Sequence, residues 1–91
     1  MPGLFLDMSG VVASPRLDCL VAFLCRTSRE KAAGLIAAGL VSVNHREALS
    51  PSSRLQEGDK VSVRRQGKFL LDQLGPTTGK GRLVVKCRKY Q

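Results

Sequence analysis

The hydrophobic period of the chain changes at Gly39. Before it, apolar residues recur at the three- and four-residue spacing of one helix face, in two segments that contain Leu17, Leu20, Val21 and Leu24 and then Ala32, Leu35 and Ile36. After it, valines alternate with polar residues over 41–44 and again over 61–64, which is typical of strands. A chain of 91 residues has room for one modest core. We therefore expect a single α+β domain in which two helices pack on an antiparallel sheet.

Capping residues set the expected helix ends. Ser14 and Pro15 predict a helix start, with Ser14 as the N-cap and Pro15 at the first position, where its missing N–H costs nothing. Thr27 and Glu30 have the spacing of a capping box, in which each side chain accepts a hydrogen bond from an orphan backbone N–H of a second helix. This helix should end just before Gly39, which suits a left-handed C-terminal cap.

Turn signals divide the rest of the chain. Asn44-His45 predicts a hairpin turn after the first strand. The other connections and strands that we expect are a polar crossing at 49–55, a tight turn at 57–59, a basic bend at 65–68, last strands at 69–71 and 83–87 joined by a flexible loop at 75–81, and a short strand at 11–13.

The positive charge of the chain is unevenly distributed. The formal charge is +8, from 15 Lys and Arg against 7 Asp and Glu. Six basic and six acidic residues fall within 1–59, whereas 60–91 holds nine basic residues and only Asp72. A surface charged for solubility alone would intersperse the two signs. The segregation favours a polyanionic partner, because clustered Lys and Arg attract phosphates.

Residue types that carry chemistry are scarce. Cys19, Cys25 and Cys87 are odd in number and lack Cys-x-x-Cys spacing, so we expect free thiols in a reducing cytoplasm and neither a metal site nor a cofactor. The one histidine, His45, has no recognisable partner for base or triad chemistry. Gly79-Lys80-Gly81 lacks the full spacing of a phosphate loop. We therefore expect a non-catalytic protein. No apolar run has the length of a membrane span, so we also expect no membrane partner.

The start of the second predicted helix combines donors with positive charge. Ser28, Arg29 and Lys31 lie beside backbone N–H groups without intrahelical acceptors, and helix N-termini attract anions. The same residues would also suit a cap and a solvated face. Helix spacing alone does not separate these two interpretations.

Three motifs follow one another along the chain: Arg16-Leu17-Asp18, then Ser28-Arg29-x-x-Ala32-x-x-Leu35-Ile36-x-x-Gly39-x-Val41-x-Val43-Asn44, then Gly58-Asp59-x-Val61-x-Val63-Arg64. In order and spacing they resemble the S-four RNA-binding domain, named for small-subunit ribosomal protein four, over about residues 14–64. The motifs that remain, Gly67-Lys68-Phe69 and Gly79-Lys80-Gly81-Arg82-Leu83-x-Val85, are similar to the C-terminal end of YlmH-like proteins. These form a bacterial branch associated with the large ribosomal subunit and with ribosome quality control.

The resemblance implies two helices packed against a small, strongly bent antiparallel sheet, the alpha-L motif. The domain would span 14–91, after an N-terminal extension at 1–13. RNA would lie along the helix pair and the first hairpin, with Leu17, Ala32, Leu35 and Ile36 in the core. The residues that we expect to face RNA are Arg16, Ser28, Arg29, Lys31, Asn44, Arg46, Lys60, Arg64 and Arg65.

Two positions depart from the family pattern. His45 stands where the family usually has Gly after Asn44, which leaves the turn type open because Gly takes a positive φ at no steric cost. Arg65 stands where the YlmH-like branch usually has Gly, and it adds a positive charge.

Together these features predict a monomeric, non-catalytic, cytoplasmic module that binds structured RNA through phosphates. Ribosomal RNA is the expected partner, with tRNA on the large subunit as a second. Only four aromatic residues are present, and three lie in apolar runs, which argues against stacking on single-stranded bases. A-form RNA displays phosphates and 2′-hydroxyls, so such a surface reads shape.

Two alternatives stay open. In the first, the chain is the RNA-targeting appendage of a larger pseudouridine synthase, RNA methyltransferase or tRNA synthetase. In the second, it is a protein-interaction module that does not bind nucleic acid. The RNA-binding interpretation would fail if Arg16, Arg29 and Lys31 were scattered on unrelated faces or locked into internal salt links.

Overall fold

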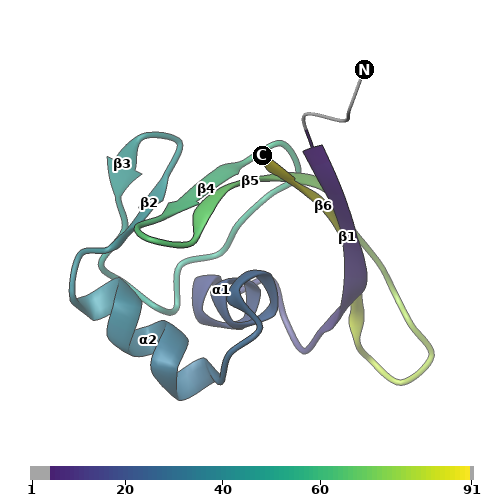
Figure 1. The fold of residues 1–91 in the computed structure, drawn as a ribbon. Coiled ribbons are helices and arrows are strands. Elements are labelled where there is room, and N and C mark those ends of the chain that lie inside the picture. The colour runs from purple at the N-terminus through teal and green to yellow at the C-terminus, as the bar shows by residue number, and fades with distance from the viewer. Residues whose placement is uncertain (1–4, 91) are drawn as a thin grey trace.

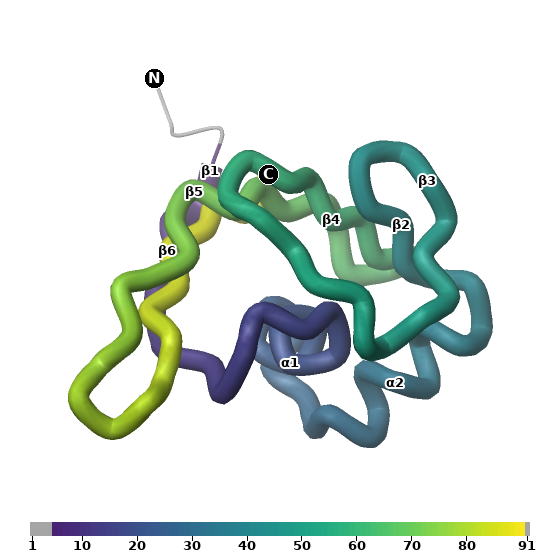
Figure 2. The backbone as a smooth tube through the Cα atoms, turned by 180° about the vertical axis from the view of Figure 1, so that it is seen from behind, coloured from purple at the N-terminus to yellow at the C-terminus, as the bar shows by residue number. Residues whose placement is uncertain are grey.

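Six strands form one antiparallel sheet in the order β1-β6-β5-β4-β2-β3, and two helices pack on it (Figure 1). The computed structural model describes residues 5–90, so residues 1–4 of the predicted extension and residue 91 lie outside the described residues. The sheet curls over α1, with β1 and β6 to one side of that helix and β2 and β3 to the other (Figure 2). The α+β prediction is confirmed. The elements are β1 Phe5–Val12, α1 Leu17–Cys25, α2 Arg29–Ala37, β2 Val41–Val43, β3 Arg46–Glu47, β4 Lys60–Val63, β5 Gly67–Thr77 and β6 Leu83–Tyr90.

Helix α1 begins three residues after the predicted N-cap. Its N-cap is Arg16, in an extended conformation with φ −71° and ψ 147°. The Leu17 N–H donates to the Ser53 carbonyl at 2.7 Å, and the Leu55 N–H donates to the Pro15 carbonyl at 2.9 Å. This short ladder with the 49–55 crossing holds the chain extended up to residue 16, so the prediction of Ser14 as the cap is wrong.

The predicted capping box of α2 is wrong by one residue. Ser28 is the N-cap, and its Oγ accepts from the Lys31 N–H at 3.2 Å. Thr27 instead belongs to the end of α1, because its N–H donates to the Ala22 carbonyl at 2.9 Å. Within residues 5–90, the Glu30 carboxylate makes no reciprocal bond to the cap. The two helices therefore meet in a tight corner around residues 26–28.

Left-handed residues form the turns. Gly39 follows α2 with φ +78°, as its predicted role as a C-terminal cap requires. Asn44 and His45 have φ +52° and +69°, the pair of positive values that defines a type I′ hairpin. Arg65 has φ +71° in the β4–β5 turn, where the Gln66 N–H donates to the Val63 carbonyl at 3.1 Å. This is the third position of a type II turn, which favours Gly.

The strands at the ends of the chain are longer than predicted. β1 runs from Phe5, not from residue 11, and pairs with β6 along its whole length. β5 continues into the predicted loop as far as Thr77. The register with β6 shifts between Leu74 and Thr77, and the strand bulges at Gly75, where φ is +116°. The prediction that the loop starts at residue 75 is therefore wrong.

The core lies between α1 and the concave face of the sheet. Its fully buried side chains include Leu17, Leu20, Ile36, Val61, Phe69, Leu71 and Val85. Leu17, Ala32 and Ile36 are core residues as predicted, whereas Leu35 is only half-buried. Gly10 lets β1 approach α1 closely, since a Cβ there would lie 2.5 Å from Cε1 of Phe23.

The three cysteines carry free thiols among apolar neighbours. Cys19 and Cys87 are buried and Cys25 is half-buried. Burial, with a smaller effect from Asp72, raises the pKa of the Cys87 thiol to about 11. A thiol that stays protonated at neutral pH acts as a small apolar side chain.

Candidate nucleic-acid interface

A buried carboxylate organises the predicted arginines. Asp18 lies in the first turn of α1 and is 5% exposed. Its Oδ1 accepts from the Cys19 N–H at 2.8 Å. Its Oδ2 accepts from Nη2 of Arg16 at 3.2 Å and from Nη2 of Arg29 at 3.3 Å. Asp18 thus brings together the residue that precedes α1 and the first residue of α2. We call Arg16, Asp18 and Arg29 the Asp18 cluster.

The Asp18 cluster keeps a net positive charge. Burial by itself would raise the pKa of Asp18, but the Arg29 hydrogen bond, the Cys19 N–H and the charges of Arg16 and Arg29 outweigh it, so this pKa lies below its ordinary value. The carboxylate is therefore ionised at neutral pH and balances one of the two guanidinium charges. Arg16 and Arg29 thus each have an internal salt link, and the condition set from the sequence depends on whether these links lock the two side chains.

Both arginines nevertheless keep unused donors at the surface. The Arg16 side chain is 41% exposed and the Arg29 side chain is 56% exposed. Each donates one hydrogen bond to Asp18, from Nη2. A guanidinium has five N–H donors, which suits it to bind phosphate and carboxylate at once. In the described residues, the buried Nε of Arg16 has no acceptor. The salt links therefore orient the two side chains without saturating them.

The two helix N-termini differ in their free donors. At α1, the N–H groups of Leu17 and Asp18 donate to the carbonyls of Ser53 and Pro51. At α2, the N–H groups of Arg29 and Glu30 have no protein acceptor within residues 5–90. Only α2 therefore presents backbone donors to an anion, next to the Asp18 cluster.

Sequence reasoning missed Arg54. The 49–55 crossing places it directly opposite Arg16 in an isolated antiparallel bridge, and it is exposed. Arg54 and the predicted Arg46 line one shallow groove of about 420 Å³ beside the β2–β3 hairpin. Nothing local marks Arg54, because it reaches the site through a long-range pairing.

Asn44 joins the first hairpin to the start of β4. Its Nδ2 donates to Asp59 Oδ1 at 3.0 Å, and its Oδ1 accepts from the Lys60 N–H at 3.0 Å. Asp59 Oδ2 in turn accepts from the Gln56 N–H at 2.8 Å. Asn44 thus has an internal structural role, while the Lys60 side chain is exposed at this end of the sheet.

The remaining predicted residues lie apart from this group. In the sheet, Val43 pairs with Val61 beside Asn44, whereas Val41 pairs with Val63 beside Arg64, so Arg64 and Arg65 are at the opposite end of β4. Lys31 lines another groove, with Cys25 and Gln66 among its walls. The structure therefore brings Arg16, Arg29, Arg46 and Arg54 into one region but does not form a single patch from all nine predicted residues.

Other kinds of site have little support in the described part of the chain. No helix in residues 5–90 is long and apolar enough to cross a membrane. The same residues contain no group of three or more His, Cys, Asp or Glu side chains that could hold a metal ion.

A basic region built on the starts of two helices, beside a shallow groove, defines a binding module for polyanions. The chain belongs to the S4 domain family, whose model matches residues 16–61. This confirms the S-four resemblance and identifies the fold as an S4 RNA-binding domain. The chain is also similar to the ribosome-associated protein quality control protein P2 of Bacillus subtilis, with 38% identity over 80 residues. The alignment covers 88% of this chain and 31% of the relative, so the chain spans about a third of that protein's length.

Proposed function

We propose that this chain binds structured ribosomal RNA through phosphate contacts and catalyses no reaction. The observation that carries the proposal is the Asp18 cluster, in which a buried carboxylate holds two half-exposed arginines together beside the free N–H groups of α2. Two guanidiniums fixed at one point match the paired oxygens of a phosphodiester. Ordering them before binding reduces the entropy lost on association.

The interface extends from the Asp18 cluster along the first hairpin. Arg54 continues it from Arg16, and Arg46 and Lys60 carry it along the end of the sheet. Ser28 and Asn44 border this path, whereas Lys31 lines a separate groove. Phosphates and 2′-hydroxyls are what an A-form helix displays to such a surface, so recognition depends on RNA shape more than on sequence.

The expected setting is the ribosome. The Bacillus relative is named as ribosome-associated, and the C-terminal motifs of this chain are similar to those of YlmH-like proteins. We propose that the chain acts in the cytoplasm as a monomer on the large ribosomal subunit, with tRNA as a possible second ligand there.

Salt-dependent binding to a structured ribosomal RNA fragment tests the proposal. Arg16→Gln with Arg29→Gln should weaken binding and reduce the slope of log K against log salt by about 0.9, because the one phosphate that the two arginines share is no longer neutralised. Arg82→Gln with Lys86→Gln removes the same charge outside the interface and is the matched control. Equal losses for both double variants would refute a localised site, and a flat salt response of the wild type would refute phosphate binding altogether.

A second candidate is an RNA-targeting appendage of a larger enzyme. It is favoured by the fact that the chain matches only 31% of its relative. The two candidates differ in the genomic context: a catalytic domain encoded in the same reading frame supports the appendage, and its absence there supports the separate module.

A further inference from the structure

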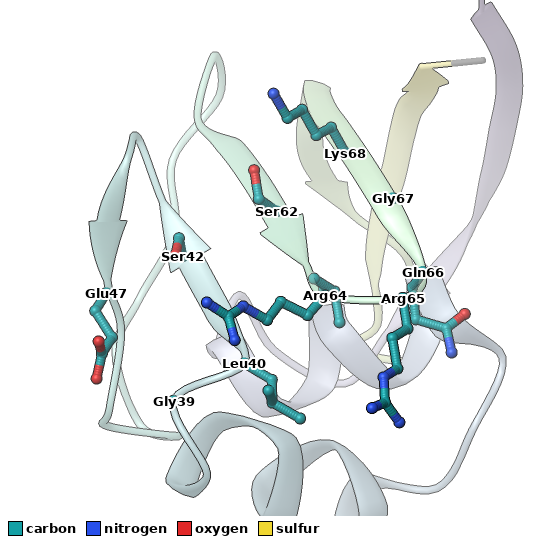
Figure 3. A pocket seen from close by; sticks show the side chains of 11 residues that line it. Gly39, Leu40, Ser42, Glu47, Ser62, Arg64, Arg65, Gln66, Gly67 and Lys68 are labelled. Atoms are coloured by element: carbon teal, nitrogen blue, oxygen red, sulfur yellow. The ribbon is translucent and has the colours of Figure 1, made fainter.

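A second basic groove lies at the β4–β5 turn, away from the Asp18 cluster. It has a volume of about 650 Å³. Its cations are Arg64, Arg65 and Lys68, and Gly39 and Leu40 are also among its lining residues. Figure 3 shows the Arg64 and Arg65 side chains extending from the turn above α2, while Ser42 and Ser62 lie on the neighbouring strands.

The cations of this groove are not neutralised internally. Within residues 5–90, none of the three makes a salt bridge, and Glu47 is the one carboxylate in the lining. Other basic residues of the same charge-rich segment are engaged: Arg88 pairs with Asp72 at 2.7 Å, and the Lys89 ammonium lies 5.9 Å from the centre of the Phe69 ring. The three cations of the groove thus remain available to a ligand, whereas two cations of β6 have internal partners.

The position of Arg65 favours a ligand-directed role. Its φ of +71° is the conformation in which a side chain is strained and Gly is not. The turn is anchored on the other side of the groove, because the Arg64 N–H donates to the Leu40 carbonyl at 2.9 Å. An arginine in a position that favours glycine adds charge to the groove at a cost in backbone energy.

The lining favours nucleic acid over a protein partner. Ser42, Ser62 and Lys68 are cross-strand neighbours, so small hydroxyl side chains form the floor beneath the cations. The anchors of protein interfaces are aromatic and large apolar side chains. The large apolar side chains that are exposed in the described residues lie elsewhere: Phe5, Leu6, Val11 and Tyr90 on β1 and β6, and Leu49 in the 49–55 crossing.

We infer that this groove binds the phosphate backbone of a second RNA segment, so that the domain joins two segments. The inference depends on the proposed function, since the first segment is held at the Asp18 cluster. The interface proposed above reaches the start of β4 at Lys60, whereas this groove lies at the other end of β4 beside Arg64, so the sheet fixes their separation. Hydroxyls of Ser42 and Ser62 supply further donors to phosphate or 2′-hydroxyl oxygens.

The test is capture of a dye-labelled ribosomal RNA hairpin on beads that carry the same hairpin without dye. The wild-type chain should bridge the two RNAs. Arg64→Gln with Arg65→Gln and Lys68→Gln should reduce the captured dye by about tenfold or more, because three phosphate contacts are lost. Binding of a single hairpin in solution should stay within about threefold of wild type, since the Asp18 cluster is unchanged.

Three comparisons make the outcome decisive. Lys80→Gln with Arg82→Gln and Lys86→Gln removes three charges elsewhere and should leave capture intact. Light scattering in the same buffer should show a monomer. Arg65→Gly, which relieves the turn and should raise the melting temperature, should still reduce capture, so a loss cannot be attributed to unfolding.

Each contrary result has a distinct meaning. Unchanged capture by the groove variant, a dimeric mass, or an equal loss of solution binding and capture would overturn the second site. Failure of the proposed function is a separate result: Arg16→Gln with Arg29→Gln, added to the groove variant, would then leave solution binding of the single hairpin unchanged.

Discussion

Replacing Asp18 by Asn removes a charge while keeping nearly the same shape. The amide oxygen can still accept from the Cys19 N–H, but the ion pairs with Arg16 and Arg29 are lost. The substitution has two opposing effects on RNA affinity. The added positive charge strengthens attraction to RNA, whereas the loss of order in the two arginine side chains weakens binding. The variant therefore separates the general charge of the domain from the arrangement of its arginines.

The expected loss of folding free energy is modest. Both arginines are 41% exposed or more, so solvent screens each ion pair to about 0.2–1 kcal/mol. A carboxylate in the first turn of α1 adds about 0.3–1 kcal/mol through the helix dipole. The variant should lose about 1–2 kcal/mol, and its melting temperature should fall by roughly 4–8 °C for each kcal/mol.

The difference in folding free energy between the wild type and Asp18→Asn should decrease as the pH falls. The folded-state pKa of Asp18 lies below its ordinary value of 3.8, so its stabilising effect is complete above that value and disappears as the pH falls through the folded pKa. Urea denaturation of both proteins between about pH 7 and about pH 2 should show the two stabilities converge at the acidic end. A constant difference would show that Asp18 does not stabilise the fold through its charge.

RNA binding should weaken although the chain becomes more positive. The formal charge rises by one from +8, which by Coulomb attraction favours RNA. Against this, two arginines must now be ordered on binding, at about 0.5–1.5 kcal/mol each. Removing one negative charge near the phosphate recovers about 1 kcal/mol. We expect a net loss of about 1 kcal/mol, which is about a fivefold weaker affinity.

The matched control is Asp72→Asn, which also adds one positive charge. Asp72 pairs with Arg88 on β5 and β6, outside the Asp18 cluster. This variant should bind RNA as tightly as wild type or more tightly. If Asp18→Asn bound RNA at least as well as Asp72→Asn, the arginines would not need the carboxylate for their arrangement, and the positioning role would be refuted.

Four further variants test the fold. Ile36→Ala should cost about 2–5 kcal/mol in urea denaturation because Ile36 is fully buried, and half-buried Leu35→Ala should cost less than half as much. His45→Gly should raise the unfolding free energy by about 0.5 kcal/mol, since relief of a left-handed side chain, about 1–2 kcal/mol, exceeds the added entropy of the unfolded chain. A lower melting temperature for this variant would show that the imidazole makes a stabilising contact. Asn44→Ala should cost about 1–2 kcal/mol by removing the hydrogen bonds of Asp59 Oδ1 and of the Lys60 N–H, and an unchanged midpoint would show that water replaces the amide.

Local signals predicted the elements that depend on neighbours in sequence. The apolar spacing around Ala32 and Ile36 and the left-handed Gly39 predicted α2, and Asn44-His45 predicted the first hairpin turn. Long-range pairing determined what the sequence did not reveal. Ser14 satisfied every local preference for a cap, but the ladder of residues 15–17 with 53–55 kept that segment extended.

The same distinction applies to the candidate site. The family resemblance predicted Arg16, Ser28, Arg29 and Lys31, because helix spacing alone left their role undecided. Asp18 was visible in the sequence only as part of a motif. Its role as the shared partner of two arginines depends on how α1 and α2 pack. Arg54 likewise enters the site through its bridge with Arg16, which no local pattern predicts.

The distribution of charge along a sequence is an incomplete guide to which basic residues bind RNA. The excess of positive charge belongs to residues 60–91, yet two basic residues of β6 are engaged internally, Arg88 by Asp72 and Lys89 by the Phe69 ring. The Asp18 cluster, in contrast, comes from residues 1–59, in which the charges balance. There, one buried carboxylate gives order to two arginines, and the order of cations contributes to affinity separately from their number. If this reasoning holds, adding lysines to β6 should raise non-specific RNA binding at low salt and leave the shape-dependent binding of folded RNA nearly unchanged.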